Sequence, residues 1–421
     1  MKEIDLVIIG GGPAGMAAAI SAKNKGIDDI LILEREDSLG GILNQCIHTG
    51  FGLHVFKENL SGPEYAQKLI NEINRLDIEY KIDTMVLSID KDKSIKAVNP
   101  EDGMFSLKAK AIILASGCRE RPKGAINIPG SKCAGIYTAG SIQKFINIEG
   151  YMPGKEVVIL GSGDVALVMA RRMALEGANI KAVVEIMPYC YGTENNVVNC
   201  LDEFDIPLKL GHTVVNIKGK DRVEGVTIAR VNEDRIPIQG TEMYIPCDTL
   251  MLSVELRGDS EIIRKTDIEL NKSTWGPKVG ENFQTMVEGI FACGNVLHVY
   301  DTADNVTKEG YSVGESASQY IKGKSFLEGE RVGLWADKGI KYLLPNFINL
   351  HNLKEDVQLK LKFDRLYENQ NIYIYFDQVK EKLSSNENIK PGDIINIEIS
   401  KNKLLSYKGL KKDNYRDKIK R

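Results

Sequence analysis

The sequence predicts an α/β protein in which one arrangement of strands and helices occurs twice, followed by a small β-rich region. Two observations predict the repeat: glycine-rich strand-to-helix turns in residues 5–26 and 156–177, and the same order of apolar and polar segments after each turn. The third observation is the alternation of apolar and polar residues beyond residue 330, which is typical of half-buried strands.

Composition limits the class of protein. The chain has 421 residues, 43% of them hydrophobic, which is enough for two or three domains with separate cores. A net charge of -3 gives no general attraction to nucleic acid or to an anionic membrane, and the short apolar start, "MKEIDLVIIGGG", is neither a signal peptide nor a membrane span. We therefore expect a cytoplasmic protein with no nucleic-acid partner and no membrane span.

Seven cysteines are present, without a C-x-x-C pair and without histidines at metal-binding spacing. This pattern argues against a disulfide framework and against a metal site. Cysteine chemistry in this chain must depend on single thiols.

The first turn, "DLVIIGGGPAG", has the order of a dinucleotide-binding unit. Gly10 allows a tight turn after a buried strand, Gly12 allows the backbone to approach a pyrophosphate, and Gly15 allows the helix to pack closely on the strand. The next strand, "DILILE", ends in Glu34, where a carboxylate can bind the hydroxyls of an adenosine ribose.

The second turn, "EVVILGSGDVA", repeats this order with Gly161, Gly163 and, in the third position, Ala166. Its following strand, "IKAVVE", ends in Glu185. A carboxylate there repels a 2′-phosphate, and no arginine follows in "EIMPYCYG", so NAD(H) is favoured over NADP(H).

Each unit continues with a helical segment, a short antiparallel meander and a returning apolar strand, "AKAIILASG" and "CDTLMLSVE". The sequence therefore predicts two nested Rossmann-like domains. Two dinucleotides that exchange electrons give such a duplication a physical reason.

The order "GGGPAG", "ASGCRERP", "GSGDVA" and "EGIFACGN" resembles the two-dinucleotide-binding-domain flavoproteins of the thioredoxin-reductase and glutathione-reductase superfamily. Segments such as "GGILNQCIHTGFGL" and "FACGNVLHVYD" resemble the branch without a redox disulfide. That branch includes subunits of sarcosine oxidase and hydrogen cyanide synthase, and the flavoprotein that accompanies glycerol-3-phosphate dehydrogenase-like proteins.

The resemblance implies two cofactors, FAD and NAD(H), and assigns residues to each. The expected FAD-binding residues are Gly10, Gly12, Pro13, Ala14, Gly15, Glu34, Gly41, Ala115, Ser116, Gly117, Gly294 and Asn295. The expected NAD(H)-binding residues are Gly161, Gly163, Asp164, Val165 and Glu185. Asn295 stands where many relatives have Asp, and an amide can still bond a ribityl hydroxyl.

Two further positions depart from the family pattern. Glu255 and Arg257 occupy positions where a glycine and an apolar residue are expected. Arg119 and Arg121, in "GCRERP", have two interpretations: they bind a cofactor phosphate or an anionic acceptor, or they form an ion pair that pins the domain hinge.

The expected catalytic residues are Cys46 and His48. Glutathione-reductase-like chains have two cysteines after the "GG" of residues 40 and 41, whereas this chain has Leu43, Asn44 and the single Cys46. Cys46 is either a small packing residue beside the flavin or a thiol that forms a sulfenic acid, and His48 is either a proton donor or a loop residue. After the returning motif, His298, Tyr300 and Asp301 are expected to line the flavin, and helix capping is an equal alternative for Asp301.

We expect residues 1–118 and 288–325 to form the FAD-binding domain and residues 119–287 the NAD(H)-binding domain. Residues 331–421 form a β-rich region with a basic tail, and they offer a docking surface for a partner protein.

The predicted function is hydride transfer between NADH and FAD, with electrons passing to or from a partner dehydrogenase or a small-molecule substrate or acceptor, in a homo- or hetero-oligomer. Two alternatives stay open: an NADH oxidase or peroxide-reducing flavoenzyme that uses Cys46, and an assembly protein with structural FAD.

Overall fold

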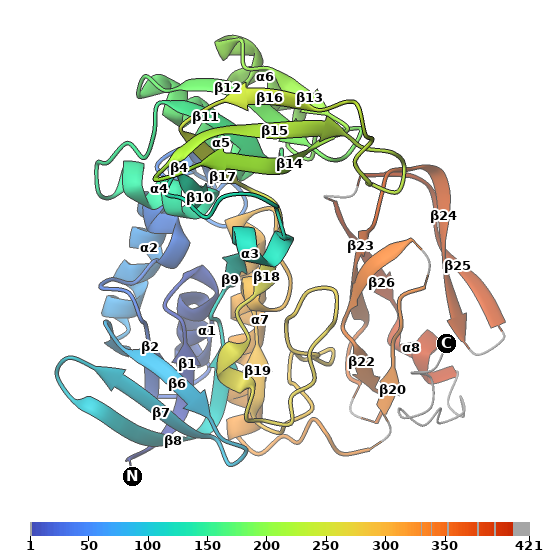
Figure 1. Ribbon diagram of the computed structural model, residues 1–421. Coiled ribbons are helices and arrows are strands. Elements are labelled where there is room, and N and C mark those ends of the chain that lie inside the picture. Colours follow the sequence, from blue (N-terminus) through green and yellow to red (C-terminus); the bar gives the residue numbers. More distant parts are fainter. Residues whose placement is uncertain are drawn as a thin grey trace. The chain divides into compact units, whose positions relative to one another are not determined.

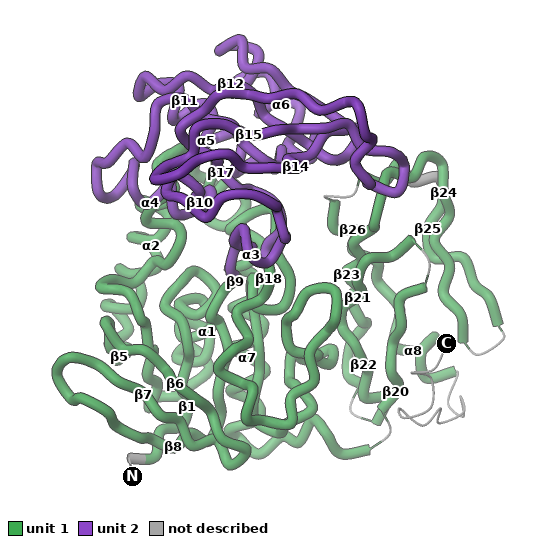
Figure 2. Tube along the Cα trace, viewed as in Figure 1, with its two compact units in different colours: residues 1–118, 257–421 green, residues 119–256 purple. Residues whose placement is uncertain are grey.

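The computed structural model describes residues 2–329, 331–337, 339–351, 353–376, 379–390 and 393–406. The chain divides into two compact units (Figure 2). Unit 1 comprises Met1–Cys118 and Arg257–Arg421, and unit 2 comprises Arg119–Leu256.

Unit 1 contains a seven-stranded sheet with five parallel strands and an antiparallel meander. Its order is β5 (Glu79–Lys81), β2 (Ile30–Leu33), β1 (Lys2–Ile9), β8 (Gly103–Leu114), β7 (Ser94–Asn99) and β6 (Met85–Ile89), with β19 (Ile290–Ala292) paired to β8. The central strands are apolar because both faces of this sheet are covered.

The main helices of unit 1 are α1 (Pro13–Asn24), α2 (Gly62–Arg75) and α7 (Ala303–Ile321). A short helix η1 (Gly41–Gln45) and the strand pair β3 (Thr49–Phe51) and β4 (Leu60–Ser61) precede α2. A capping box between Ser61 and Glu64 starts α2, and Thr302 caps α7 by accepting a bond from the Asn305 N–H.

Helices α1 and α7 lie against each other through small residues (Figure 1). A Cβ on Gly310 would lie 2.4 Å from the Ala14 carbonyl oxygen, and a Cβ on Gly314 would lie 2.2 Å from that of Ala18. Glycine at both positions therefore sets how closely α7 approaches the beginning of α1.

Unit 2 repeats the arrangement with a five-stranded parallel sheet and a separate three-stranded meander. The sheet order is β10 (Ile136–Thr138), β17 (Thr249–Leu252), β11 (Glu156–Leu160), β12 (Asn179–Glu185) and β13 (Leu208–Leu210), and the meander consists of β14 (His212–Gly219), β15 (Val223–Arg230) and β16 (Met243–Pro246). The helical segments are α3 (Lys123–Ile126), α4 (Ala139–Asn147), α5 (Asp164–Leu175), α6 (Glu194–Cys200) and η2 (Asp202–Phe204).

The two sheets correspond strand by strand. In unit 1 the order β5, β2, β1, β8 and β19 matches β13, β12, β11, β17 and β10 in unit 2, and helices α1 and α5 follow the equivalent strands β1 and β11. The predicted α/β class with two Rossmann-like domains is confirmed.

The chain returns from unit 2 to unit 1 at a different residue from the one expected. Residues 257–287, which we expected in the NAD(H)-binding domain, group with unit 1. Ile263, Ile268 and Val279 in this stretch pack into the core beside β8, which gives the grouping a physical reason. The stretch begins at β18 (Leu256–Gly258), which pairs with β9 (Cys118–Glu120), and continues through η3 (Glu261–Ile263).

The region beyond α7 is rich in strands, as predicted, and has its own apolar core. Its sheets are β20 (Arg331–Gly333) with β22 (Phe347–Asn349), β21 (Ile340–Leu344) with β23 (Val357–Phe363) and β26 (Ile394–Ile399), and β24 (Tyr367–Phe376) with β25 (Val379–Ile389). Helix α8 (Lys401–Ser406) follows, and the basic tail, residues 407–421, lies outside the described residues.

A membrane-spanning helix would need a long apolar run. In the part of the chain that the structure describes, no helix combines the required length and hydropathy.

Candidate functional site

The carboxyl ends of four strands in unit 1 bring most of the predicted flavin residues together. In the register of the sheet, Leu114 of β8 is paired with Ile9 of β1 and with Ala292 of β19. The residues that follow these strands, Gly10, Ala115 and Cys293, therefore start from the same edge. Ligands of open α/β sheets bind at this edge.

The glycines of the first turn fit a dinucleotide. A Cβ on Gly10 would lie 2.3 Å from the Ala115 carbonyl oxygen, and one on Gly15 would lie 1.9 Å from the Gly10 carbonyl oxygen. At Gly12, by contrast, nothing lies within 4 Å of that position. Gly12 is the N-cap of α1 and makes no side-chain cap, so the positive end of this helix faces open space that suits a pyrophosphate.

Pro13 and Ala14 form the first turn of α1, and the loop with Gly41 lies against Gly12. A Cβ on Gly41 would lie 3.2 Å from the Gly12 Cα, and the Gly40 N–H donates to the Gly11 carbonyl at 2.9 Å. The structure therefore places Gly41 beside the first glycine-rich turn.

Glu34 is buried at the end of β2 and accepts two backbone hydrogen bonds. The Gly11 N–H donates to its Oε2 at 2.6 Å, and the Glu36 N–H donates to its Oε1 at 2.9 Å. These bonds fix the carboxylate next to the turn, where an adenosine ribose is expected.

Unit 2 builds the same cradle. A Cβ on Gly161 would lie 1.9 Å from the Ser253 carbonyl oxygen, whereas nothing lies within 4 Å of the position at Gly163, the N-cap of α5. The Glu185 carboxylate is buried and accepts hydrogen bonds from the Ser162 N–H at 3.0 Å and from the Met187 N–H at 2.9 Å. This arrangement matches that of Glu34.

Asp164 and Val165 begin α5. One Asp164 oxygen, Oδ1, accepts bonds from the Thr193 N–H at 2.8 Å and from the Asn196 amide at 2.7 Å, so it holds the start of α6. The Val165 side chain is exposed. A cofactor-binding role for these two residues stays a prediction.

The remaining predicted flavin residues lie after β8 and β19. The Ser116 hydroxyl donates to the Asp259 carbonyl at 2.8 Å, and the Asp259 N–H donates to the Gly117 carbonyl at 2.9 Å. Asn295, in η4 (Gly294–Val296), accepts a bond from the Tyr300 N–H at 3.1 Å through Oδ1. Its side chain thus shapes the returning loop.

Cys46 packs against the first turn of α2. Its thiol donates to the Ile42 carbonyl at 3.3 Å, and its own carbonyl accepts from the Gly62 N–H at 2.8 Å. A Cβ on Gly62 would lie 2.8 Å from the Cys46 Cβ. These contacts are those of a half-buried packing residue.

His48 lies in the same loop, with its ring 5.1 Å from the Phe51 ring. Burial lowers the pKa of His48 below the ordinary value for histidine. The imidazole is therefore predominantly neutral at neutral pH, a form that can accept a proton.

Two arginines singled out from the sequence have partners in the structure. The Arg121 guanidinium pairs with Glu255 at 2.9 Å, which explains the unexpected acid at residue 255. Arg257 lies over the Trp275 ring, 4.5 Å from its centroid. Capping by Asp301 is wrong, because Thr302 occupies the N-cap of α7.

Three further residues were not found from the sequence. Ser162 donates a second bond, through its hydroxyl, to Glu185 at 2.7 Å. Glu309 is buried on α7 and pairs with Lys360 of β23 at 2.5 Å. Ser162 could have been predicted from its position between Gly161 and Gly163. No sequence pattern indicates that Glu309 and Lys360 form a pair.

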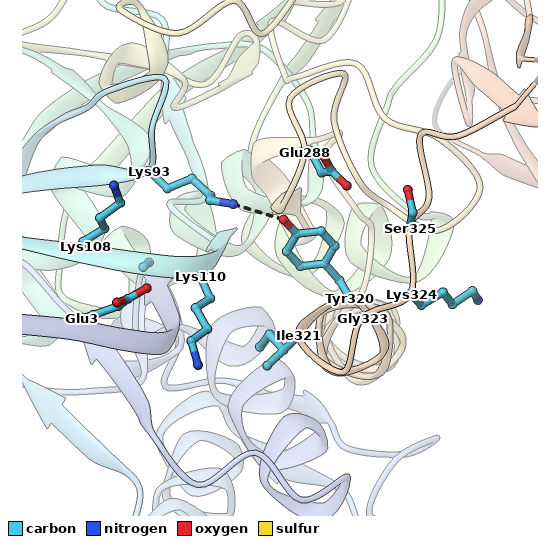
Figure 3. Close-up of a pocket in the computed structure, with 11 residues that line it drawn as sticks. Glu3, Lys93, Lys108, Lys110, Glu288, Tyr320, Ile321, Gly323, Lys324 and Ser325 are labelled. Carbon is cyan, nitrogen blue, oxygen red and sulfur yellow. Dashed lines mark hydrogen bonds between the residues drawn. The ribbon is translucent and has the colours of Figure 1, made fainter.

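A separate pocket of about 440 Å³ lies at the amino ends of the strands in unit 1 (Figure 3). Four lysines line it, and each has a near neighbour: Lys93 with Tyr320, Lys108 with Asp92, Lys110 with Asp5 and Lys324 with Gln319. The pocket therefore lies away from the carboxyl ends of the strands, where the glycine-rich turn is found, and its lysines already have polar or charged neighbours.

The family model "Pyridine nucleotide-disulphide oxidoreductase" matches residues 4–310 of this chain. Strands β20–β26 lie beyond the end of that match.

Curated relatives include two proteins of similar identity. Hydrogen cyanide synthase subunit HcnB of Pseudomonas protegens is 25% identical over 65% of this chain and 61% of its own length. A 34.2 kDa protein in the rubredoxin operon of Clostridium pasteurianum is 26% identical over 77% of this chain and 99% of its own. The chain therefore spans less than two thirds of the first of these relatives.

Among solved structures, thioredoxin reductase of T. acidophilum is similar in fold. The TM-score is 0.63 at 21% identity, over 77% of this chain and 100% of that enzyme.

Proposed function

Because the chain belongs to the pyridine nucleotide-disulphide oxidoreductase family, we propose that it transfers a hydride between NADH and FAD and exchanges the electrons with a partner dehydrogenase or a small substrate. The observation that carries this proposal is the pair of matching cradles, in which Glu34 and Glu185 make equivalent hydrogen bonds beside glycine-rich turns.

As a member of this family, the protein is an FAD-dependent pyridine nucleotide oxidoreductase, and its cofactors are FAD and NAD(P)H. When bound, FAD supplies an isoalloxazine ring that accepts a hydride from a reduced nicotinamide. The chain supplies binding and orientation: Gly12 and the start of α1 receive one pyrophosphate, and Gly163 and the start of α5 receive the other.

NADH is the proposed nicotinamide substrate because of the charge at the end of β12. The Glu185 carboxylate is fixed by three hydrogen-bond donors and suits a free ribose hydroxyl as a further donor. A 2′-phosphate at the same place would meet a buried negative charge.

A partner or a small substrate is proposed for the second half-reaction. Glutathione-reductase-like chains have two relay cysteines after the "GG" of residues 40 and 41, whereas this chain has Leu43, Asn44 and the single Cys46. All seven cysteines lie within the described residues, and no two of them form a disulfide. Two relatives, from hydrogen cyanide synthase of Pseudomonas protegens and from opine oxidase of Rhizobium meliloti, are by name subunits of larger enzymes. They support a protein partner for this chain as well.

The test is an anaerobic titration of the FAD-loaded protein with NADH and, in parallel, with NADPH. Bleaching of the oxidised flavin band by NADH, with much slower bleaching by NADPH, is the expected result. If neither nucleotide bleaches the flavin while FAD stays bound, hydride transfer is excluded and a structural role for FAD replaces it.

A second experiment addresses the electron exit. The NADH-reduced protein is mixed anaerobically with a purified candidate partner dehydrogenase and, separately, with hydrogen peroxide. Reoxidation by the dehydrogenase only supports the partner-linked reaction. Rapid reoxidation by peroxide only contradicts it and favours the alternative that uses Cys46.

A further inference from the structure

We propose that Lys360, from the β-rich region beyond the family match, is a positioning residue of the flavin site: it holds the Glu309 carboxylate against the backbone of the returning loop, residues 293–300. The proposal goes beyond the proposed function and rests only on FAD occupying unit 1. It makes the β-rich region a structural part of the flavin site.

Glu309 connects the returning loop to the β-rich region. Its side chain is 1% exposed. Oε1 accepts a hydrogen bond from the Gly294 N–H at 2.8 Å, while Oε2 accepts from the Lys360 ammonium at 2.5 Å and from the Tyr300 hydroxyl. One carboxylate thus links the start of the loop, the end of the loop and strand β23.

Gly294 is the point at which this network meets the phosphate-binding turn. Its φ is +74°, and a Cβ there would lie 2.8 Å from the Cβ of Ala14, in the first turn of α1. A displacement of the Gly294 N–H therefore moves the loop relative to the end of α1 that receives the pyrophosphate. Asn295, which we expect to contact the ribityl chain, follows immediately.

Lys360 is the charge that Glu309 needs. Burial alone raises the pKa of Glu309, but the nearby Lys360 ammonium and the His298 ring, whose Nε2 lies 3.9 Å from Oε2, outweigh it, and the pKa is lowered to about 2. The Lys360 ammonium also lies 5.0 Å from the centre of the Tyr300 ring and 5.5 Å from that of Phe283. Removing Lys360 leaves a buried carboxylate without its cation, which is strongly unfavourable.

A second contact comes from the same region. The hydroxyl of Tyr342, on β21, is 3.0 Å from Nδ1 of His298, a buried residue of the returning loop. Two strands of the β-rich region, β21 and β23, therefore contact this network. The contact from β23 brings the charge of Lys360 to Glu309.

The chain offers a matched control in Lys362. It lies two residues further along β23, on the same face, and its side chain is 17% exposed against 18% for Lys360. Its nearest acid is Asp301 at 3.8 Å, whose side chain is half exposed. Lys362→Met therefore removes an equal charge from the same strand without touching Glu309.

The experiment measures the FAD dissociation constant of the full-length apoprotein, followed by quenching of flavin fluorescence. Lys360→Met is expected to raise this constant about tenfold or more, whereas K362M and the charge-preserving K360R stay within about threefold of the wild type. Because Lys360 acts through Glu309, the double variant E309Q/K360M is expected to bind FAD more weakly than the wild type but no more weakly than K360M, far from the product of the two single effects.

Three results overturn the proposal: FAD affinity of K360M within about twofold of the wild type, equal losses for K360M and K362M, or effects of K360M and E309Q that multiply in the double variant. If K360M does not fold, the double variant E309Q/K360M is compared with K362M, because the double variant buries no unpaired charge. Wild-type affinity of that double variant also overturns the proposal. These readouts need no nicotinamide, so they are independent of the NADH titration.

Discussion

Glu185 accepts two hydrogen bonds from Ser162, one from the backbone N–H at 3.0 Å and one from the hydroxyl at 2.7 Å. In unit 1, Gly11 stands in the place of the serine. It has no side chain, so it donates to the equivalent Glu34 through its backbone N–H alone. The hydroxyl of Ser162 also accepts a bond from the Tyr191 N–H at 3.0 Å. The serine therefore connects Glu185 to both the second glycine-rich turn and the following loop.

Replacing Glu185 by Gln should weaken the proposed preference for NADH. The amide keeps the shape of the side chain but loses the charge that binds ribose hydroxyls and repels a 2′-phosphate. We expect kcat/KM for NADH to fall about tenfold and the ratio of NADH to NADPH efficiencies to fall by more than that. Steady-state flavin reduction with both nucleotides measures the change.

Two variants serve as controls for this prediction. Glu233→Gln removes an exposed charge in the same unit and should leave the ratio unchanged. Ser162→Ala keeps the carboxylate, so its effect on the ratio should be smaller than that of E185Q. An unchanged ratio in E185Q would show that the acid does not select the nucleotide.

The contact between α1 and α7 predicts that Gly310→Ala destabilises the protein. Its new Cβ would lie 2.4 Å from the Ala14 carbonyl oxygen and 2.9 Å from the Ala17 Cβ. Overpacking of this kind costs about 1–3 kcal/mol and exceeds the gain of up to about 1 kcal/mol from better helix propensity. Urea unfolding should therefore show a lower free energy of unfolding and weaker FAD binding.

Gly124→Ala is the matched control, because Gly124 lies in a helix with nothing within 4 Å of its Cβ position. This variant should be neutral or slightly stabilised. Equal stability of both variants would contradict the close packing of α7 on α1.

The geometry of the two glycine-rich turns could be predicted from the sequence because its determinants are local. Gly10, Gly15 and Glu34 lie within one unit of strand, turn, helix and next strand, so their spacing is sufficient to predict the tight turn, the close helix packing and the buried acid. The grouping of residues 257–287 with unit 1 could not be predicted, because it depends on where Ile263 and Ile268 find an apolar core.

Lys360 shows a different reason for failure. The alternation in "VQLKLKF" correctly predicts a strand with Leu359 and Leu361 on its apolar face. It also suggests that the lysine face meets solvent, whereas Lys360 lies against Glu309. Periodicity identifies two faces, but a lysine on the polar face does not reveal that its ammonium meets a buried acid 51 residues away in the sequence.

The ion pair predicts a specific pH dependence of stability. In the folded wild type the pKa of Glu309 is about 2, below the ordinary value of 4.5, so the unfolded state binds the proton first. Its contribution to stability is complete above about pH 4.5 and is lost as the pH falls toward 2. In K360M the burial of Glu309 is no longer offset, so its pKa rises and the sign reverses.

The difference in melting temperature between wild type and K360M should therefore be large at neutral pH. It should shrink as the pH falls, first above 4.5, where Glu309 of K360M takes up a proton, and then between 4.5 and 2, where the wild type loses the stability that its ion pair contributes. The other titratable groups around Glu309, namely His298 and Tyr300 in the loop, Cys293 after β19 and Tyr342 on β21, are present in both proteins. Thermal melts of the apoprotein across this range provide the measurement. A difference independent of pH would show that lost packing, and not the charge, causes the effect.

The position of Cys46 predicts the outcome of its replacement by serine. A serine hydroxyl can still donate to the Ile42 carbonyl and fits the packing against Gly62, so the local structure should be kept. Stopped-flow reduction of the flavin by NADH should then stay within about twofold of the wild type, because hydride transfer between the cofactors needs no thiol. Cys133→Ser, at another half-buried cysteine, controls for the loss of a thiol as such.

The same two variants, C46S and C133S, are assayed for NADH consumption with hydrogen peroxide, in which a reactive thiolate would be oxidised to a sulfenic acid as peroxide is reduced. Peroxide-dependent activity that C46S abolishes and C133S retains would instead assign Cys46 a redox role and favour the single-thiol alternative.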